Sequence, residues 1–377
     1  MEATVNSKPA ETDLYDITFI GAGPVALYGM YYAGLRLMRF KAIDMLDEVG
    51  GGLMALYPEK YIYDVAGFPK VLAKDLTRQM EEQANQYPGT LCLGEKVLSL
   101  RRTDDGLIEL TTNKGRHLSK TVVICAGLGA YIPKKLDIPN VEELEGAGVY
   151  YSARRISDFA DKNILIVGGG DSAFDYSMML EPVARKITHI HRNDFFSAHE
   201  DSVRKVRQSS VELLVPFWEV KRIEGDDWVR EVTIVQTRTG EERTLPIDAI
   251  IFNIGFLTNL GPIEQWGLEL EKNAIKVDSR MRTNIEGVYA AGDIVTYDGK
   301  LKLISTGCGE VAVAVNNAKN YINPRAKVSP GHSTDKHELA QQKWARKAAR
   351  EKRAADDAET NPTASPPEPR TEKGMGQ

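Results

Sequence analysis

The chain has 377 residues, of which 42% are hydrophobic and 27% are charged, and its formal net charge is −5. This length suits two domains with sizeable cores, and the small net charge gives no overall electrostatic attraction to nucleic acid. The three cysteines, Cys92, Cys125 and Cys308, form no CxxC pair and no disulfide framework, and no apolar run reaches the roughly 20 residues of a membrane span. Because the start of the chain also lacks a signal-peptide pattern, the sequence predicts a cytoplasmic protein without a nucleic-acid, membrane or metal site.

The first predicted unit is a strand, a glycine-rich turn and a helix. The strand is the β-branched and aromatic run at 15–20, and the residues after it have apolar side chains at helical spacing. Gly21, Gly23 and Ala26 form a GxGxxA motif, whose small residues allow a tight turn, the approach of a pyrophosphate and close packing of helix on strand. Asp44 ends the next strand, 23 residues after Gly21, where its carboxylate can accept hydrogen bonds from both hydroxyls of a ribose.

The same order of elements returns about 147 residues later with a second GxGxxA motif that ends in Ala173. The residues expected to contact a second dinucleotide are Gly168, Gly170, Asp171, Ser172, His191 and Arg192. The strand after this motif ends in His191 and Arg192 instead of an acidic residue, and a cation there favours the 2′-phosphate of NADPH over NADH. The alternative is that Arg192 is a solvated surface side chain.

Two such units in one chain predict an α/β fold with two Rossmann-like dinucleotide-binding domains. Residues 1–13 are polar and are expected to be disordered. Residues 335–377 have first the composition of a helix with little to bury and then that of a disordered tail. The segment 343–353 carries six Lys/Arg and one Glu, so as a helix it would present a basic surface to an acidic partner, or it would simply be solvated.

The chain resembles the thioredoxin-reductase-like ferredoxin–NADP reductases in seven segments that follow one another in the same order: GAGPVALYGMYYAGLR, GGGLMALYPEKYIYDVAGFPK, GGGDSAFDYSMMLEP, HRNDFFSAHE, NIGFLTNLGPI, NIEGVYAAGDI and GHST. The resemblance implies an FAD enzyme, usually a homodimer, that passes electrons between NADPH and ferredoxin or flavodoxin. It also implies a discontinuous FAD domain, residues 14–127 plus 255–334, with an NAD(P)H domain at 128–254 between its two parts.

The resemblance further implies roles around the flavin. Tyr57 matches the tyrosine that stacks on one face of the isoalloxazine, and His332 matches the residue that covers the other face, where the nicotinamide must enter. Asp44 matches the residue that holds the adenosine ribose, and Asp293 matches an aspartate near the ribitol and pyrophosphate. The helix after residues 307–309 would direct its N-terminus at the flavin and stabilise the reduced anion. The other implied FAD contacts are Gly21, Gly23, Pro24, Gly52, Val97, Tyr131, Ser333 and Thr334.

No acid–base residue is required by this scheme, because the cofactors carry the hydride and electron transfers and the protein positions them. The chain departs from the family pattern in the segment HRNDFFSAHE, where Asn193 and Ser197 replace two expected arginines. Losing these charge-assisted contacts weakens the case for NADPH and leaves NADH open. Gly52 stands where a glutamine is usual, which leaves that FAD contact to the backbone.

Two other functions stay open at this point. An NAD(P)H-dependent disulfide-type reductase would need a thiol, but residues 150–162 read YYSARRISDFADK where one form carries CxxC, and Val25 stands where the one-cysteine form carries its thiol. An FAD-binding redox sensor would bind the cofactor without sustained turnover. Ferredoxin-coupled oxidation of NAD(P)H separates the sensor from a reductase.

Overall fold

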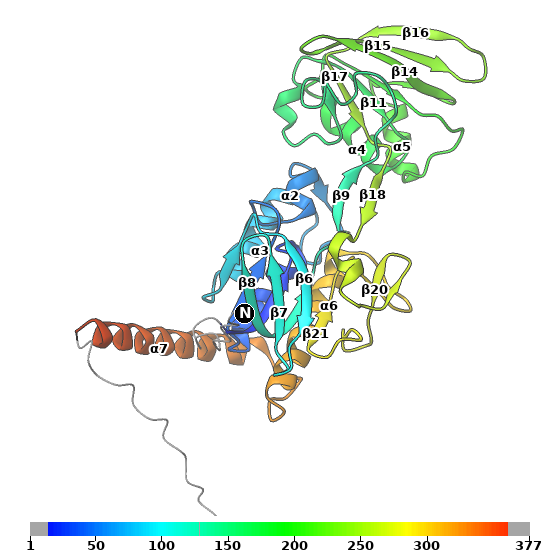
Figure 1. The fold of residues 1–377 in the computed structure, drawn as a ribbon. Helices are drawn as coiled ribbons and strands as arrows, with labels where there is room; N and C mark the ends of the chain where they lie inside the picture. The colour runs from blue at the N-terminus through cyan, green and yellow to red at the C-terminus, as the bar shows by residue number, and fades with distance from the viewer. Residues whose placement is uncertain (1–13, 128, 361–377) are drawn as a thin grey trace, which may run out of the picture.

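The computed structural model describes residues 14–127 and 129–360 as two α/β parts joined by a pair of short strands (Figure 1). Side chains within this range are not described for residues 130–132, 256–258, 333–335, 351 and 353–360. In the described part of the chain, no helix is both long and apolar enough to cross a membrane.

The first part is built on a sheet in the order β5-β2-β1-β8-β7-β6, with β21 also paired to β8. Its strands are β1 (Leu14–Ile20), β2 (Phe40–Ile43), β5 (Thr90–Cys92), β6 (Val97–Arg102), β7 (Ile108–Thr112), β8 (Arg116–Ile124) and β21 (Val288–Ala290). β1, β2, β5, β8 and β21 pair in parallel, so β21 returns to the sheet from late in the chain. Helices pack on this sheet and on one another, namely α1 (Pro24–Leu35), α3 (Ala73–Ala84) and α6 (Ile304–Ile322).

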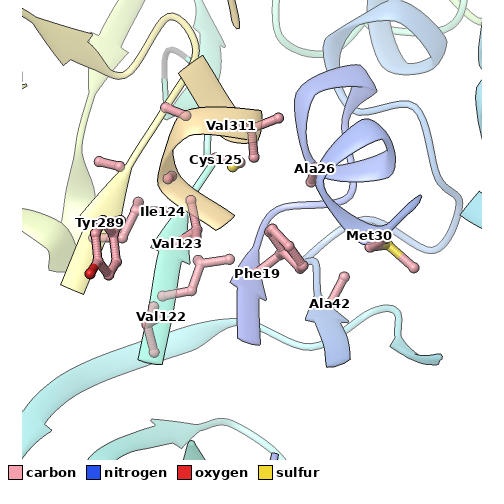
Figure 2. Packing of buried hydrophobic residues seen from close by; sticks show 14 of the residues in the cluster. Phe19, Ala26, Met30, Ala42, Val122, Val123, Ile124, Cys125, Tyr289 and Val311 are labelled. Atoms are coloured by element: carbon pink, nitrogen blue, oxygen red, sulfur yellow. The ribbon is translucent and has the colours of Figure 1, made fainter. Parts of the chain in front are cut away.

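The core of the first part lies where α1 and α6 meet β1 and β8 (Figure 2). Phe19 of β1, Met30 of α1 and Val311 of α6 are all buried there. A Cβ at Gly29 would lie 2.6 Å from both Phe19 and Val311, so the glycine allows the helices and the strand to approach closely. This packing holds the amino end of α1 at the carboxyl edge of the sheet.

The second part has a parallel sheet in the order β10-β17-β11-β12-β13. Its strands and helices are β10 (Val149–Tyr150), β11 (Asn163–Val167), β12 (Lys186–Ile190), β13 (Glu212–Leu214), β17 (Ala249–Phe252), α4 (Asp171–Leu180) and α5 (Glu200–Arg207). The buried runs of β11, β12 and β17 are typical of parallel strands covered on both faces. An antiparallel sheet packs against this core and consists of β14 (Trp218–Gly225), β15 (Val229–Gln236) and β16 (Glu242–Pro246).

The two parts are linked by the antiparallel pair β9 (Ala130–Pro133) and β18 (Phe256–Asn259) (Figure 1). Polar contacts also join them: an ion pair between Lys60 and Asp175, and a hydrogen bond of 2.9 Å from the Tyr176 hydroxyl to the Leu56 carbonyl. The remaining elements are α2 (Gly52–Leu56), β3 (Tyr61–Ile62), β4 (Val71–Leu72), η2 (Ile156–Phe159), η3 (Gly261–Gln265), β19 (Leu270–Glu271), β20 (Ala274–Lys276), β22 (Val295–Thr296) and α7 (Ser333–Thr360).

The helix α7 begins where the sequence predicts a helical tail, but its first half is packed instead of fully solvated. Ala340 is buried, and the indole N–H of Trp344 donates a hydrogen bond of 2.9 Å to the carbonyl of Gly34. Gly34 lies in the last turn of α1, and its carbonyl also accepts a hydrogen bond of 2.9 Å from the backbone N–H of Leu37. The tail therefore docks on the carboxyl end of α1 and then projects away from the first part (Figure 1).

Candidate cofactor sites

A cavity of about 530 Å³ lies at the carboxyl ends of the strands β1, β2 and β8. β1 has β2 on one side and β8 on the other, so this edge is the point where strand order reverses, the usual place for a ligand in such sheets. The cavity is lined by the turn after β1, by Asp44 after β2 and by Cys125 after β8. Figure 2 shows Cys125 at the end of β8, between α1 and α6.

The glycine turn after β1 is held by Asp44. The backbone N–H of Ala22 donates to one carboxylate oxygen at 2.6 Å, and that of Leu46 donates to the other at 2.8 Å. Burial raises the pKa of Asp44, and these two hydrogen bonds oppose that effect. A Cβ at Gly21 would lie 2.5 Å from the Cys125 carbonyl oxygen, so this position requires glycine. Asp44 thus orders the turn in addition to facing the cavity, a role that spacing alone does not indicate.

The amino end of α1 faces the same cavity. Gly23 precedes the helix and Pro24 is its first residue, where the missing N–H of proline costs no hydrogen bond. The cavity lining contains most of the FAD contacts predicted from the sequence: Gly21, Gly23, Pro24, Asp44, Gly52, Tyr57, Val97 and Asp293. The helix terminus therefore offers N–H groups and a positive dipole end to an anion in the cavity.

Tyr57 and Asp293 both line the cavity. The resemblance assigns Tyr57 to the flavin ring and Asp293 to the ribitol and pyrophosphate. Burial raises the pKa of Tyr57, and the nearby carboxylates of Asp293 and Asp64 add to that effect. Burial also raises the pKa of Asp293, whereas Lys300 and Lys302 act in the opposite direction. Both side chains are half-buried.

The helix expected after residues 307–309 begins earlier than predicted. α6 starts at Ile304, and Leu303 and Ile304 line the cavity. Gly307 lies inside its first turns, where a Cβ would meet Val25 at 2.5 Å. Gly307 therefore allows close packing against the amino end of α1, and the amino end of α6 still faces the cavity.

The structure does not bring His332 to this cavity. His332 is exposed, and the following helix α7 docks on the opposite end of α1, because Ala340 and Trp344 find apolar contacts there. His332 is therefore not among the residues that line this cavity, and its place over the flavin stays a prediction. Ser333 and Thr334 begin α7, but their side chains lie outside the described residues, as does that of Tyr131 in β9.

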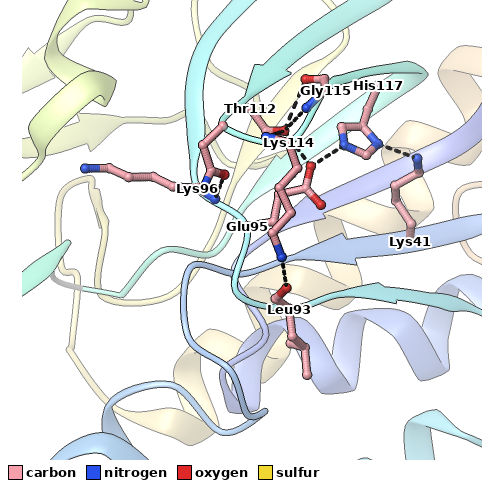
Figure 3. A network of polar contacts seen from close by, with 9 residues as sticks. Lys41, Leu93, Glu95, Lys96, Thr112, Lys114, Gly115 and His117 are labelled. Atoms are coloured by element: carbon pink, nitrogen blue, oxygen red, sulfur yellow. Dashed lines mark hydrogen bonds and ion pairs between the residues drawn. The ribbon is translucent and has the colours of Figure 1, made fainter.

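A buried polar network that the sequence did not indicate borders the other end of the cavity (Figure 3). Glu95 lines the cavity and accepts hydrogen bonds from His117 Nε2 at 2.7 Å and from the Thr112 hydroxyl at 2.5 Å. His117 Nδ1 in turn lies 2.9 Å from Lys41 Nζ. Burial alone would raise the pKa of Glu95, but these hydrogen bonds hold it below its usual value. The network fixes the start of β6 beside Val97.

The second glycine motif lies at the carboxyl end of β11. Gly170 precedes α4, and Asp171 and Ser172 form its first turn. A Cβ at Gly168 would lie 2.4 Å from the Asn253 carbonyl oxygen, so the turn needs glycine for close approach. One oxygen of the Asp171 carboxylate accepts a hydrogen bond of 2.8 Å from the backbone N–H of His199.

A fully buried histidine holds this second turn. His189 Nε2 lies 2.9 Å from the Gly168 carbonyl oxygen, and Nδ1 lies 2.9 Å from the Ser177 hydroxyl. The neutral ring therefore donates from Nε2 to Gly168 and accepts at Nδ1 from Ser177. Burial lowers the pKa of His189 to about 4. The C=O and N–H of a trans peptide point in opposite directions. Because His189 holds the Gly168 carbonyl, the N–H of Gly169 in the same peptide points away from His189.

The corner predicted for a 2′-phosphate contains one exposed arginine. Arg192 is exposed and makes no ion pair within the described ranges. The ring of His191 stacks on Phe196 with centroids 5.5 Å apart. Ser197, which replaces an arginine of the family pattern, donates from its backbone N–H and its hydroxyl to the Gly169 carbonyl. Asn193, the other replacement, is half-buried.

A larger cavity, of about 860 Å³, lies between the two parts. It is lined by Met54 and Pro58 from the first part and by Tyr150, Tyr151 and Arg154 from the second, among others. This is where the disulfide-reducing forms of the fold would carry CxxC according to the resemblance. No group of three His, Cys, Asp or Glu side chains suited to a metal ion occurs among the described residues.

Known proteins with similar sequences support the dinucleotide-binding fold that the glycine motifs and the two sheets indicate. A family model described as pyridine nucleotide-disulphide oxidoreductase matches residues 15–318. The ferredoxin–NADP reductase of Geobacillus kaustophilus is 49% identical over 324 residues, 86% of this chain and 98% of that protein. That of Symbiobacterium thermophilum is 50% identical over 328 residues, 86% of this chain and 97% of that protein.

Among solved structures, the thioredoxin reductase of T. acidophilum matches with a TM-score of 0.71 at 24% identity, over 83% of this chain and 99% of that one. This likeness and the two parallel sheets confirm the predicted α/β fold with two dinucleotide-binding domains. The family predicted from the sequence segments is confirmed as well. The chain belongs to the ferredoxin–NADP reductases within the pyridine nucleotide-disulphide oxidoreductase family.

Proposed function

We propose that the protein is an FAD-dependent reductase that moves electrons between NAD(P)H and ferredoxin or flavodoxin. The observation that carries this proposal is the cavity at the carboxyl edge of the first sheet, with its lining of GxGxxA turn, Asp44, Tyr57 and Asp293. When bound, FAD supplies the chemistry, accepting a hydride from the nicotinamide and releasing electrons one at a time. The names of the relatives support ferredoxin as the partner.

The residues of the first part position the cofactor. The amino end of α1 would bind the pyrophosphate through backbone N–H groups, and Asp44 would use the remaining lone pairs of its carboxylate for the adenosine ribose. Tyr57 would pack against the flavin ring. Asp293 and the amino end of α6 would lie near the ribitol and the ring, where a positive dipole end would favour the reduced anion. We propose residues 14–127 and 255–334 as the FAD domain.

The second part, residues 128–254, binds the nicotinamide nucleotide in this proposal. Its contacts are Gly168, Gly170, Asp171, Ser172, His191 and Arg192. Arg192 favours NADPH, because an exposed guanidinium without an ion pair can take a 2′-phosphate in a bidentate manner. Asn193 and Ser197 add no charge, so we expect only a modest preference for NADPH over NADH, and we expect the enzyme to use NADH as well.

We further propose that the enzyme is a homodimer. α1 is apolar around its whole circumference, yet Tyr28, Tyr31 and Tyr32 are only half-buried within one chain. A helix that is apolar all round is normally buried on all sides. Light scattering of the purified protein tests this proposal, and a monomer mass at micromolar concentration would contradict it.

The two alternative functions are a disulfide-type reductase and an FAD-binding redox sensor. A disulfide-type reductase needs a thiol beside the flavin. Cys125 lines the proposed site, but burial raises its pKa far above the usual range, which opposes thiolate chemistry. An FAD-binding redox sensor would hold the flavin without sustained turnover.

Steady-state oxidation of NADPH and NADH by the purified protein, with ferredoxin as acceptor, tests the proposal. We expect rapid ferredoxin-dependent turnover and a higher kcat/KM with NADPH than with NADH. Bound FAD with negligible turnover would support the sensor instead. Turnover with a low-molecular-weight disulfide but not with ferredoxin would support the disulfide reductase.

A further inference from the structure

Glu310 is a buried carboxylate directly behind the wall of the flavin cavity. It lies in α6 and accepts three hydrogen bonds: from the Gly292 backbone N–H at 2.8 Å, from the Tyr297 hydroxyl at 2.6 Å and from Lys300 Nζ at 2.6 Å. The side chains of Lys300 and Glu310 are only 6% and 5% exposed. This is an ion pair held almost without solvent, in which each carboxylate oxygen has a donor.

The three contacts of Glu310 reach two separate stretches of the cavity wall. Gly292 is followed by Asp293, and both residues line the cavity. Tyr297 and Lys300 belong to the loop that leads to Leu303 and Ile304, which line it as well. One carboxylate therefore fixes the turn that carries Asp293 and the loop that starts α6.

The pair also balances charge at this wall. Glu310 lies six residues after Ile304, so its negative charge sits within two turns of the amino end of α6 and would oppose the positive dipole there. The ammonium of Lys300 cancels that charge. The ionisable groups that interact with the pair include Asp293, whose pKa responds to both of its members, the Tyr297 hydroxyl and the Cys125 thiol, and Lys302 acts on Asp293.

We propose that the Lys300–Glu310 pair positions the flavin-binding wall and sets the reduction potential of the flavin, an inference that rests on the FAD site proposed above. A hydride from NAD(P)H brings two electrons and one proton, so the nicotinamide leaves as NAD(P)⁺ and the flavin gains one negative charge. A fixed charge behind a wall with little solvent shifts that equilibrium more than a solvated one does. Lys300 and Glu310 therefore act on the potential with opposite signs.

The test compares four variants of the flavin-loaded protein by equilibrium redox titration. Lys300→Met leaves the Glu310 charge uncompensated, and we expect a lower midpoint potential than in the wild type. Glu310→Gln leaves the Lys300 charge, and we expect a higher one. The double variant K300M/E310Q has no net change in charge and should return close to the wild-type value. Tyr297→Phe is the matched control, because it removes one hydrogen bond and keeps both charges.

Shifts of the two single variants in the same direction, or shifts no larger than that of Tyr297→Phe, would overturn the inference and leave the pair a purely structural contact. If a single variant fails to fold or to retain FAD, the double variant K300M/E310Q shows whether the pair acts through its charges. Recovery of FAD binding and of the wild-type potential supports charge pairing, and loss of FAD in the double variant overturns it. Absence of flavin in the wild-type protein would instead contradict the proposed function.

Discussion

At the scale of single residues, Asp44 combines two roles that are usually considered separately. Its carboxylate accepts hydrogen bonds from the Ala22 and Leu46 backbone N–H groups and lines the cavity proposed for FAD. The spacing from the first glycine predicts only the contact with the ribose. Asp44 also orders the glycine turn, because its carboxylate lies within hydrogen-bond distance of the backbone N–H groups of Ala22 and Leu46.

Replacing Asp44 by Asn should therefore weaken FAD binding. The amide carries no charge, so the two backbone hydrogen bonds and the ribose contact lose their charge-assisted character, which is worth roughly 1.5–3 kcal/mol per bond. We expect FAD affinity to fall by at least about tenfold in reconstitution titrations of the apoprotein. The control is Asp104→Asn, at an exposed position. Equal affinity in the two variants would refute the double role.

His189 makes the stability of the protein depend on pH. Its folded-state pKa of about 4 lies below the ordinary 6.5 of histidine, so the unfolded chain takes up the proton first as the pH falls. The stabilisation is complete above about pH 6.5 and is lost progressively toward pH 4, by about 3 kcal/mol in total.

Urea unfolding between pH 4 and 7 measures this dependence. His189→Gln should flatten the curve in that window, and the exposed His199→Gln should leave it unchanged. A wild-type stability that stays constant from pH 6.5 to pH 4 would contradict the assignment of a neutral His189.

At the scale of elements, α7 shows how tertiary contacts change what composition predicts. Its sequence is that of a solvated helix, yet Trp344 bonds the Gly34 carbonyl at the end of α1. Trp344→Ala should lower the free energy of unfolding by about 2 kcal/mol, from lost apolar burial and one hydrogen bond. Because α1 is 12 residues long and the cavity lies at its other end, FAD content should not change.

Thermal unfolding measures the loss of stability in Trp344→Ala, and the flavin-to-protein absorbance ratio measures its FAD content. The control is Lys343→Ala, whose side chain is exposed one position earlier in α7. Loss of FAD in Trp344→Ala would contradict the placement of α7 away from the cofactor.

The elements that the sequence predicted well are those in which several local signals coincide. At Gly21–Asp44 and at Gly168–Arg192, a buried strand, a small-residue turn and a helix follow one another, and each reinforces the others. The location of His332 and the network of Glu95, His117 and Lys41 depend on contacts between distant segments. No local signal encodes such contacts, so the sequence could not place them.

At the scale of the whole molecule, the two parts meet through few contacts. The flavin cavity is lined by no residue of the second sheet, whereas hydride transfer requires the nicotinamide to reach the flavin. The pair β9–β18 links the two parts (Figure 1), and we expect them to turn about it so that the nicotinamide reaches the flavin. The ion pair between Lys60 and Asp175 opposes such a turn.

Lys60→Met should therefore speed the reduction of the flavin by NADPH. A partly exposed ion pair contributes up to about 1 kcal/mol, so we expect an increase of up to about fivefold in stopped-flow experiments. Lys120→Met removes a similar ion pair, with Asp16, inside the first part and serves as the control. A slower reduction in Lys60→Met than in this control would mean that the observed arrangement is already the productive one.

In the proposed mechanism, FAD in the first cavity exchanges electrons with both a nicotinamide and a ferredoxin. Anaerobic titration of the purified protein tests it most directly. We expect NADPH to bleach the visible absorbance of a bound flavin and oxidised ferredoxin to restore it. A protein purified without flavin, or a flavin that NADPH and NADH both leave oxidised, would contradict it.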